Sequence, residues 1–188
     1  MKTIAAALLA ASFVAPALAA DNGTQAMADA VNKFYAAYHT VKTSDGIPNA
    51  KLLPKYTPLI TPALNQLLIA GDQAEARFAK ANPDTPPMRE GDIFTSNFEG
   101  ATTYKVGACK AEGKGGMCQV DFVYDPGKTN NPKDKPFKWS DSVTVAMTDK
   151  GWRVDDVLYR GTWDFGNKGK LSDSLKEAVK ESTEPQAP

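Results

Sequence analysis

The segment GWRVDDVLYRG, residues 151–161, opens on a glycine typical of turns and continues as a β-strand. Its tryptophan, valine, leucine and tyrosine residues favour a pleated, half-buried strand. Two adjacent carboxylates, Asp155 and Asp156, lie in its middle. Facing an interior, they are a candidate catalytic pair; facing solvent, they are charges on a bent strand.

The preceding segment, FKWSDSVTVAMT at residues 137–148, alternates apolar and polar residues and pairs with this strand through the turn TDKG. If the pairing is unbroken, Val143 lies opposite Asp156, and Asp156 points at the apolar face beside Asp141. Burial and a like-charged neighbour each raise the pKa of a carboxyl group, which is how a general acid or base is made.

A β-bulge at Asp155-Asp156 shifts this register by one residue. Val143 then meets Val157, and both aspartates point outward into water. We expect the bulge, because an unpaired carboxylate among apolar side chains is far more costly than one extra residue in a strand. The unbroken strand stays open as the alternative, with three neighbours that could satisfy a buried Asp156: Tyr35, Arg153 and Tyr159.

Period-2 patterns separated by glycine, proline and asparagine clusters indicate strands over much of the second half of the chain. Five strands are predicted, near residues 92–98, 101–110, 117–125, 137–148 and 152–160. Helical patterns precede and follow them. The first helix can be capped by Thr24 and carries an apolar stripe to Val41, and the second runs from the cap Thr61-Pro62 to about Ala81.

A short closing helix follows near residues 171–179, with Ser172 or Ser174 as its cap. Helices before an antiparallel meander predict an α+β fold. In this fold the N-terminal helices pack on one face of a curved, mostly antiparallel sheet, and the short C-terminal helix completes the domain.

The N-terminus has the pattern of a secretory signal peptide: Lys2, an apolar run over residues 4–14, and an A-x-A site at residues 17–19. We expect cleavage after Ala19 and a soluble periplasmic protein, with one domain over residues 20–182 and a disordered tail over 183–188. The apolar run is too short to span a bilayer, and no other segment approaches the required length.

The two cysteines, Cys109 and Cys118, flank a glycine-rich turn between two strand patterns. In an oxidising compartment this arrangement predicts a cross-strand disulfide. A free thiol or a metal pair is the alternative, but His39 is the only histidine in the chain. We therefore expect no metal site and no cofactor.

Charge excludes one class of partner. Lysine plus arginine equals aspartate plus glutamate at 22 each, so nothing indicates a nucleic acid partner. The lysine-rich stretch GKTNNPKDKPFK, residues 127–138, contains prolines typical of a connection, and we interpret it as a solvated loop in preference to an anion site.

Three further residue types are candidates for a site. His39 lies on the flank of the first helix's apolar stripe, and we expect a surface or partly buried side chain in preference to a catalytic base. No Gly-x-Ser-x-Gly elbow and no phosphate-binding loop is present. Trp163 and Phe165, in GTWDFGNKG, either plug the open end of the fold or form a contact surface; we expect the plug.

Several motifs together resemble a known family: KFYAAY in the first helix, GDIFTSNF, the Trp-x-Asp of residues 139–141, GWRVDDVLYRG, and LSDSLKEAV near the end. The chain from about residue 27 to 180 is similar to a bacterial envelope family of unassigned function that is related to the nuclear transport factor 2-like, cystatin-like cone fold. The resemblance implies a cone-like fold. It implies no activity, because this fold hosts enzymes, carriers and adaptor domains. Some members are lipoproteins, but the anchor cysteine is missing here, so a membrane-bound role does not carry over.

Two classes of function remain. The first is a non-catalytic periplasmic module that binds an envelope protein or a small ligand through its cone or sheet face; an inhibitor or immunity role is one form of it. The second is a small hydrolase or isomerase that uses Asp141 and Asp156. We favour the first, assign no catalytic residue, and leave dimerisation through the sheet open. The candidate pocket or contact residues are Tyr35, His39, Trp139, Asp141, Asp156, Tyr159 and Trp163.

Overall fold

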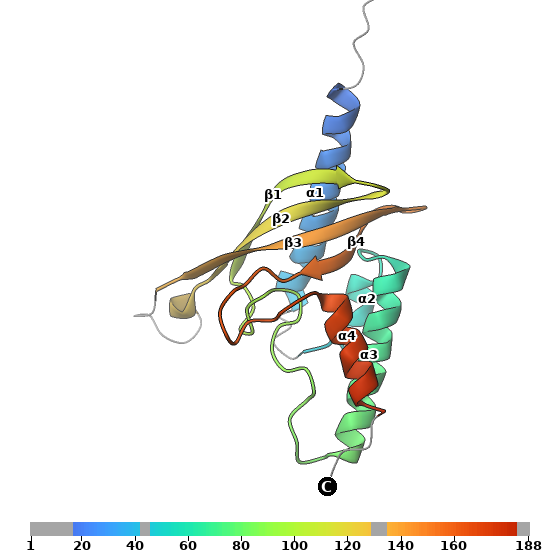
Figure 1. Ribbon diagram of the computed structural model, residues 1–188, viewed down its shortest axis with the longest axis vertical. Coiled ribbons are helices and arrows are strands. Elements are labelled where there is room, and N and C mark those ends of the chain that lie inside the picture. Colours follow the sequence, from blue (N-terminus) through green and yellow to red (C-terminus); the bar gives the residue numbers. More distant parts are fainter. Residues whose placement is uncertain (1–16, 42–45, 129–134, 184–188) are drawn as a thin grey trace, which may run out of the picture.

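A computed structural model describes residues 17–41, 46–128 and 135–183, with side chains from Gly23 onward (Figure 1). The elements follow in the order α1 (Ala17–Val41), α2 (Leu53–Tyr56), α3 (Pro62–Ala81), β1 (Thr103–Glu112), β2 (Gly115–Tyr124), the 3-10 turn η1 (Pro126–Lys128), β3 (Phe137–Thr148), β4 (Gly151–Leu158) and α4 (Leu171–Glu181). The fold is α+β, as predicted. The signal peptide predicted for residues 1–19 falls mostly outside the described residues, as do the central part of the lysine-rich stretch and most of the predicted tail.

The four strands form one curved antiparallel sheet in the order β1-β2-β3-β4, so each strand pairs with its neighbour in the chain. Side chains on β3 alternate strictly: Trp139, Asp141, Val143 and Val145 are buried, and the intervening residues are partly exposed. The sheet therefore has an inner face that packs on the core and an outer face that is largely polar.

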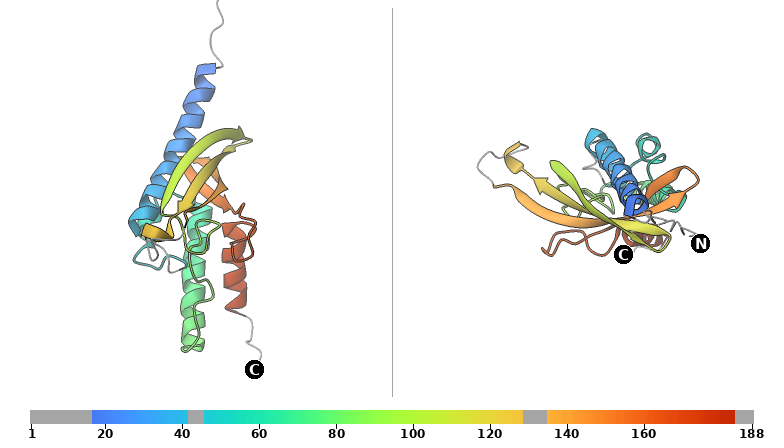
Figure 2. Two further views of the ribbon diagram at one scale, coloured as in Figure 1. Left: turned by 90° about the vertical axis from the view of Figure 1, so that its left-hand side faces the viewer. Right: turned by 90° about the horizontal axis from the view of Figure 1, so that it is seen from above.

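Helix α1 crosses the inner face and contacts all four strands, and the sheet curves around it (Figure 2). The predicted apolar stripe is buried at Met27, Val31, Phe34 and Tyr38, each at most 5% exposed, and partly buried at its last residue, Val41. Tyr35, beside the stripe, is fully buried. These side chains form the centre of the core together with Val120, Phe122 and Val143 from the sheet.

Helices α3 and α4 lie side by side beyond the β4 edge of the sheet (Figures 1 and 2). Helix α3 begins as predicted, because the hydroxyl of Thr61 accepts a hydrogen bond from the Leu64 amide at 3.2 Å and Pro62 occupies the first helical position. The segment before α3 pairs with the edge of the sheet through a parallel bridge between Ile60 and Val154.

The predicted disulfide between Cys109 and Cys118 is present and links β1 to β2 at directly paired positions. Cys118 is fully buried, so the bond belongs to the core side of the sheet. Within the described part of the chain, no helix combines the length and the apolar composition needed to cross a membrane.

Three local predictions are wrong. Residues 92–98 form no strand; they are a series of bends whose backbone groups bond mainly to side chains. Helix α4 is not capped by Ser172 or Ser174, because Lys170 occupies the cap position without a side-chain bond. Thr24 does not cap the first helix, because α1 begins at Ala17 and Thr24 lies within it. One element was not predicted at all: the proline-rich stretch before Thr61 contains a helical turn, α2.

Candidate functional site

The inner space of the curved sheet is filled by a loop of the protein itself. Residues 92–97 are each no more than 8% exposed, although four of the six are polar. In Figure 1 this segment belongs to the green loops below the strands. The ring of Phe94 lies 5.0–5.2 Å from the rings of Tyr56 and Phe34, so the loop packs directly on the core. We call residues 91–100 the inner loop.

Side chains from distant elements satisfy the backbone carbonyls of the inner loop. The hydroxyl of Tyr35 donates to the Phe94 carbonyl at 3.0 Å, and the hydroxyl of Tyr159 donates to the Ile93 carbonyl at 2.6 Å. The amide nitrogen of the Asn167 side chain donates to two further carbonyls of the loop, both at 2.7 Å. Burial raises the pKa of both tyrosines, so their hydroxyls stay protonated and remain donors.

Asp141 anchors the inner loop to the sheet. Its carboxylate accepts hydrogen bonds from the amide of Ser96 at 2.7 Å, from the Ser96 hydroxyl, from the Trp139 indole at 3.1 Å and from the Arg160 amide at 2.9 Å. A carboxylate that is only 1% exposed is tolerated because it has this many donors. These hydrogen bonds explain the burial of Asp141 by a structural role, which is to hold the inner loop against the sheet.

Asp92, a second buried carboxylate, lies within the inner loop and is not among the candidates predicted from the sequence. It accepts hydrogen bonds from the Tyr38 hydroxyl at 2.5 Å, the Phe94 amide at 2.7 Å and the Thr95 hydroxyl at 2.9 Å. Burial, with a smaller contribution from the charge of Asp141, raises the pKa of Asp92 to about 7 against the opposing effect of these hydrogen bonds.

The bulge predicted in β4 is confirmed. Val143 pairs with Val157 and Thr144 pairs with Asp156, whereas Val145 pairs with Val154, so Asp155 is the extra residue. Both aspartates leave the apolar face. The expectation that both lie in water is wrong for Asp156, which is only 9% exposed.

Asp156 is buried because its carboxylate caps helix α4. It accepts hydrogen bonds from the Ser172 amide at 3.0 Å, the Ser172 hydroxyl at 2.6 Å and the Val157 amide at 2.9 Å. Asp155 points instead to the other helix, where it accepts a hydrogen bond from the Thr61 hydroxyl at 2.8 Å. The two adjacent carboxylates thus bind the starts of two different helices. Asp156 bonds to none of the three neighbours that the sequence offered for it.

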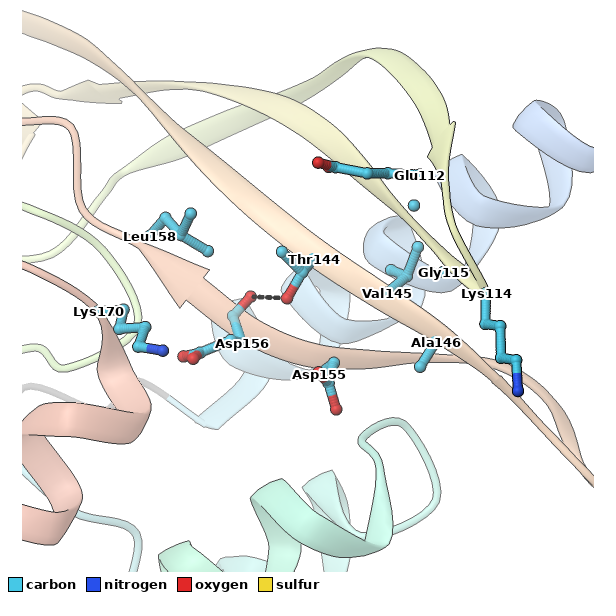
Figure 3. Close-up of a pocket in the computed structure, with 11 residues that line it drawn as sticks. Glu112, Lys114, Gly115, Thr144, Val145, Ala146, Asp155, Asp156, Leu158 and Lys170 are labelled. Carbon is cyan, nitrogen blue, oxygen red and sulfur yellow. Dashed lines mark hydrogen bonds between the residues drawn. The ribbon is translucent and has the colours of Figure 1, made fainter.

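A groove of about 470 Å³ lies on the outer side of the sheet near these aspartates (Figure 3). In Figure 3, Asp156 points toward Lys170 at the start of α4, and Thr144 lies above it on β3. The groove is also lined by Glu112 and Lys114 from the β1–β2 turn. It carries charges of both signs. A second hollow of about 500 Å³ on the same face is lined by Lys105, Asp121 and Ser140, among others.

The residues predicted for a site do not converge on one cavity. Tyr35, Trp139, Asp141 and Tyr159 lie together on the inner side, around the inner loop. Asp156 faces the outer groove, and Trp163 packs against Phe137 at the start of β3 with ring centroids 4.8 Å apart. His39 stacks on Tyr104 at 5.1 Å, and burial lowers its pKa.

The candidate carboxylates are poorly placed for acid–base chemistry. Asp141 and Asp156 lie on opposite sides of the sheet, and each already accepts several protein hydrogen bonds. Among the described residues, no group of three or more histidine, cysteine, aspartate or glutamate side chains is placed to hold a metal ion. Comparison of the sequence with protein-family models and with curated proteins found no match, so the likeness to the cone-fold family stays a prediction.

Proposed function

We propose that this chain is exported through its N-terminal segment and acts in the periplasm as a binding or accessory module without catalysis. Its contacts with an envelope protein or a small ligand would use outer surfaces of the fold. An inhibitor or immunity role against an envelope enzyme is one form of this function.

One observation carries the proposal: the inner loop occupies the space that a ligand or substrate would need inside the curved sheet. Residues 92–97 are buried there, and their polar groups are paired with Tyr35, Tyr38, Asp141 and other core residues. An enzyme using Asp141 and Asp156 would need both carboxylates at one cavity, whereas they lie on opposite sides of β3 and β4. The signal-like N-terminus and the disulfide support export.

The test is native mass spectrometry of the protein purified from the periplasm. We expect the mass of a chain that begins at Ala20 or Asp21, less the two hydrogens of the disulfide, with no small molecule retained. Retention of Met1 would contradict export. A co-purifying small molecule that is lost when Phe94 is changed to alanine would place a ligand in the interior and would contradict binding through outer surfaces.

A further inference from the structure

Two aromatic side chains, Phe137 and Trp163, pack together where β3 begins, and a third, Phe165, follows two residues after Trp163 in the loop between β4 and α4. Phe165 is 90% exposed, and Phe137 is 40% exposed. Trp163 is partly buried and bridges from Phe137, at 4.8 Å between ring centroids, to the core residue Trp139, at 6.0 Å. We call Phe137, Trp163 and Phe165 the aromatic tip. A ring as exposed as that of Phe165 has no role in packing this domain, so the plug expected from the sequence is wrong for Phe165.

The loop that presents Phe165 is ordered by its own contacts. The Lys168 ammonium donates hydrogen bonds to the carbonyls of Gly161, at 3.1 Å, and Trp163. Asn167 ties the loop to the inner loop through a bond from its amide to the Ser96 carbonyl at 2.8 Å. A β-carbon at Gly161 or Gly166 would approach the Trp163 ring to 2.5 or 2.9 Å. The ring therefore packs against backbone positions where only glycine leaves enough space.

Charge around the aromatic tip differs from that of the whole chain. The segments 135–138 and 160–168 contain four cationic residues, Lys135, Lys138, Arg160 and Lys168, and one acidic residue, Asp164, all of them exposed. Their net charge is four minus one, or +3, whereas the whole chain balances 22 basic against 22 acidic residues. The tip therefore lies in the locally positive part of a neutral protein.

We propose that the aromatic tip docks on an anionic lipid surface, with Phe165 and Phe137 entering the headgroup region and the side chains of Lys135, Lys138 and Arg160 facing lipid phosphates. An exposed phenylalanine flanked by cations suits a fluid anionic interface. A peptide or protein segment requires a complementary groove. The second outer hollow reaches Lys138 and Trp139 beside the tip, but Phe137, Trp163 and Phe165 line neither hollow. The inference rests on the proposed export, because export brings the protein to such surfaces.

The test is co-sedimentation of the exported protein with vesicles of phosphatidylcholine alone or mixed in equal parts with phosphatidylglycerol. We expect binding to the mixed vesicles that weakens as salt is raised. Phe165→Ser should lower the partition coefficient about ten-fold, as expected when one phenylalanine is no longer buried in the interface. The matched control is Met147→Ser, because Met147 is 55% exposed at the opposite end of β3 and should leave binding unchanged.

Equal binding of the parent and Phe165→Ser would overturn the docking proposal, as would absence of binding to the mixed vesicles. Cross-linking from the tip to a protein, with no vesicle binding, would assign the tip to a protein partner instead. All variants have the same N-terminus. If the apolar run over residues 4–14 were retained and bound the vesicles, it would do so equally in every variant and could not cause a difference between them. A failure of vesicle binding in a correctly exported, ligand-free protein leaves the binding-module proposal intact, whereas a retained Met1 overturns export whatever the vesicles show.

Discussion

At the scale of single residues, the protein keeps two carboxylates inside its core and treats them differently. Asp141 receives amide, hydroxyl and indole donors from three separate segments. Asp92 lies in the inner loop with two hydroxyl donors and one amide donor. Burial dominates at Asp92 and raises the pKa of its carboxyl group to about 7.

This pKa predicts how stability depends on pH. The ordinary pKa of an aspartate, 3.8, applies to the unfolded chain, so between about pH 4 and 7 the folded protein holds a proton on Asp92 that the unfolded chain has released. The free energy of unfolding should therefore fall as pH rises through this window and level off above it. Each unit of pKa difference corresponds to about 1.4 kcal/mol.

Urea unfolding across this pH range checks the prediction. Asp92→Asn should remove most of the decline, because the asparagine side chain does not titrate. Asp149→Asn, at an exposed turn, should keep the parent's slope. Parallel curves for the parent and Asp92→Asn would show that another group controls the pH dependence.

At the scale of secondary structure elements, the bulge in β4 positions two helices. The extra residue places Asp155 against the cap of α3 and Asp156 against the first turn of α4. Helix α4 has no side-chain cap of its own, so the carboxylate of Asp156 supplies an acceptor for its first free amides and favours its positive end.

Asp156→Ala should lower the free energy of unfolding by about 2 kcal/mol, because the Ser172 amide and hydroxyl lose a charged acceptor in a buried site. Asp155→Ala removes the same charge one residue away, where the side chain is exposed, and should cost no more than about 1 kcal/mol. Urea unfolding of both variants at neutral pH gives the comparison. Equal losses would mean that Asp156 does not cap α4.

The same elements show what the sequence could and could not predict. The four strands of the sheet, helix α3 with its cap and the register at Val143 follow from patterns within a few residues. The capping of α4 could not be predicted, because its acceptor lies on a strand 16 residues before Ser172. Residues 92–98 resemble a strand in sequence, but their polar atoms bond to partners up to 75 residues away, which no local pattern indicates.

The candidate site was predicted less well than the fold. Asp92, Ser96 and Asn167 are the centre of the buried hydrogen bonds, yet no local spacing marks them. The segment GDIFTSNF contained one weak indication of a buried loop. Its polar residues lie between two phenylalanines, Phe94 and Phe98, which is unusual for a connection on the surface. The outward direction of Asp155 and Asp156 was predictable, because the apolar face needs Val157 at that point.

At the scale of the whole molecule, the sheet curves around α1 (Figure 2). The inner loop is buried against the same side of the sheet, where Ser96 bonds to Asp141, so the fold encloses its own residues. A filled interior leaves the outer sheet face and the aromatic tip for contacts with other molecules. This arrangement distinguishes the proposed surface-binding module from an enzyme or carrier that uses an inner cavity.

Amide hydrogen exchange tests this claim most directly. The amides of Phe94 and Ser96 are bonded to the buried carboxylates of Asp92 and Asp141, so residues 92–98 should be protected as strongly as β3 and far more than the exposed connection over residues 82–90. Exchange of residues 92–98 at the rate of residues 82–90 would show that the inner loop opens readily, and it would contradict a permanently filled interior.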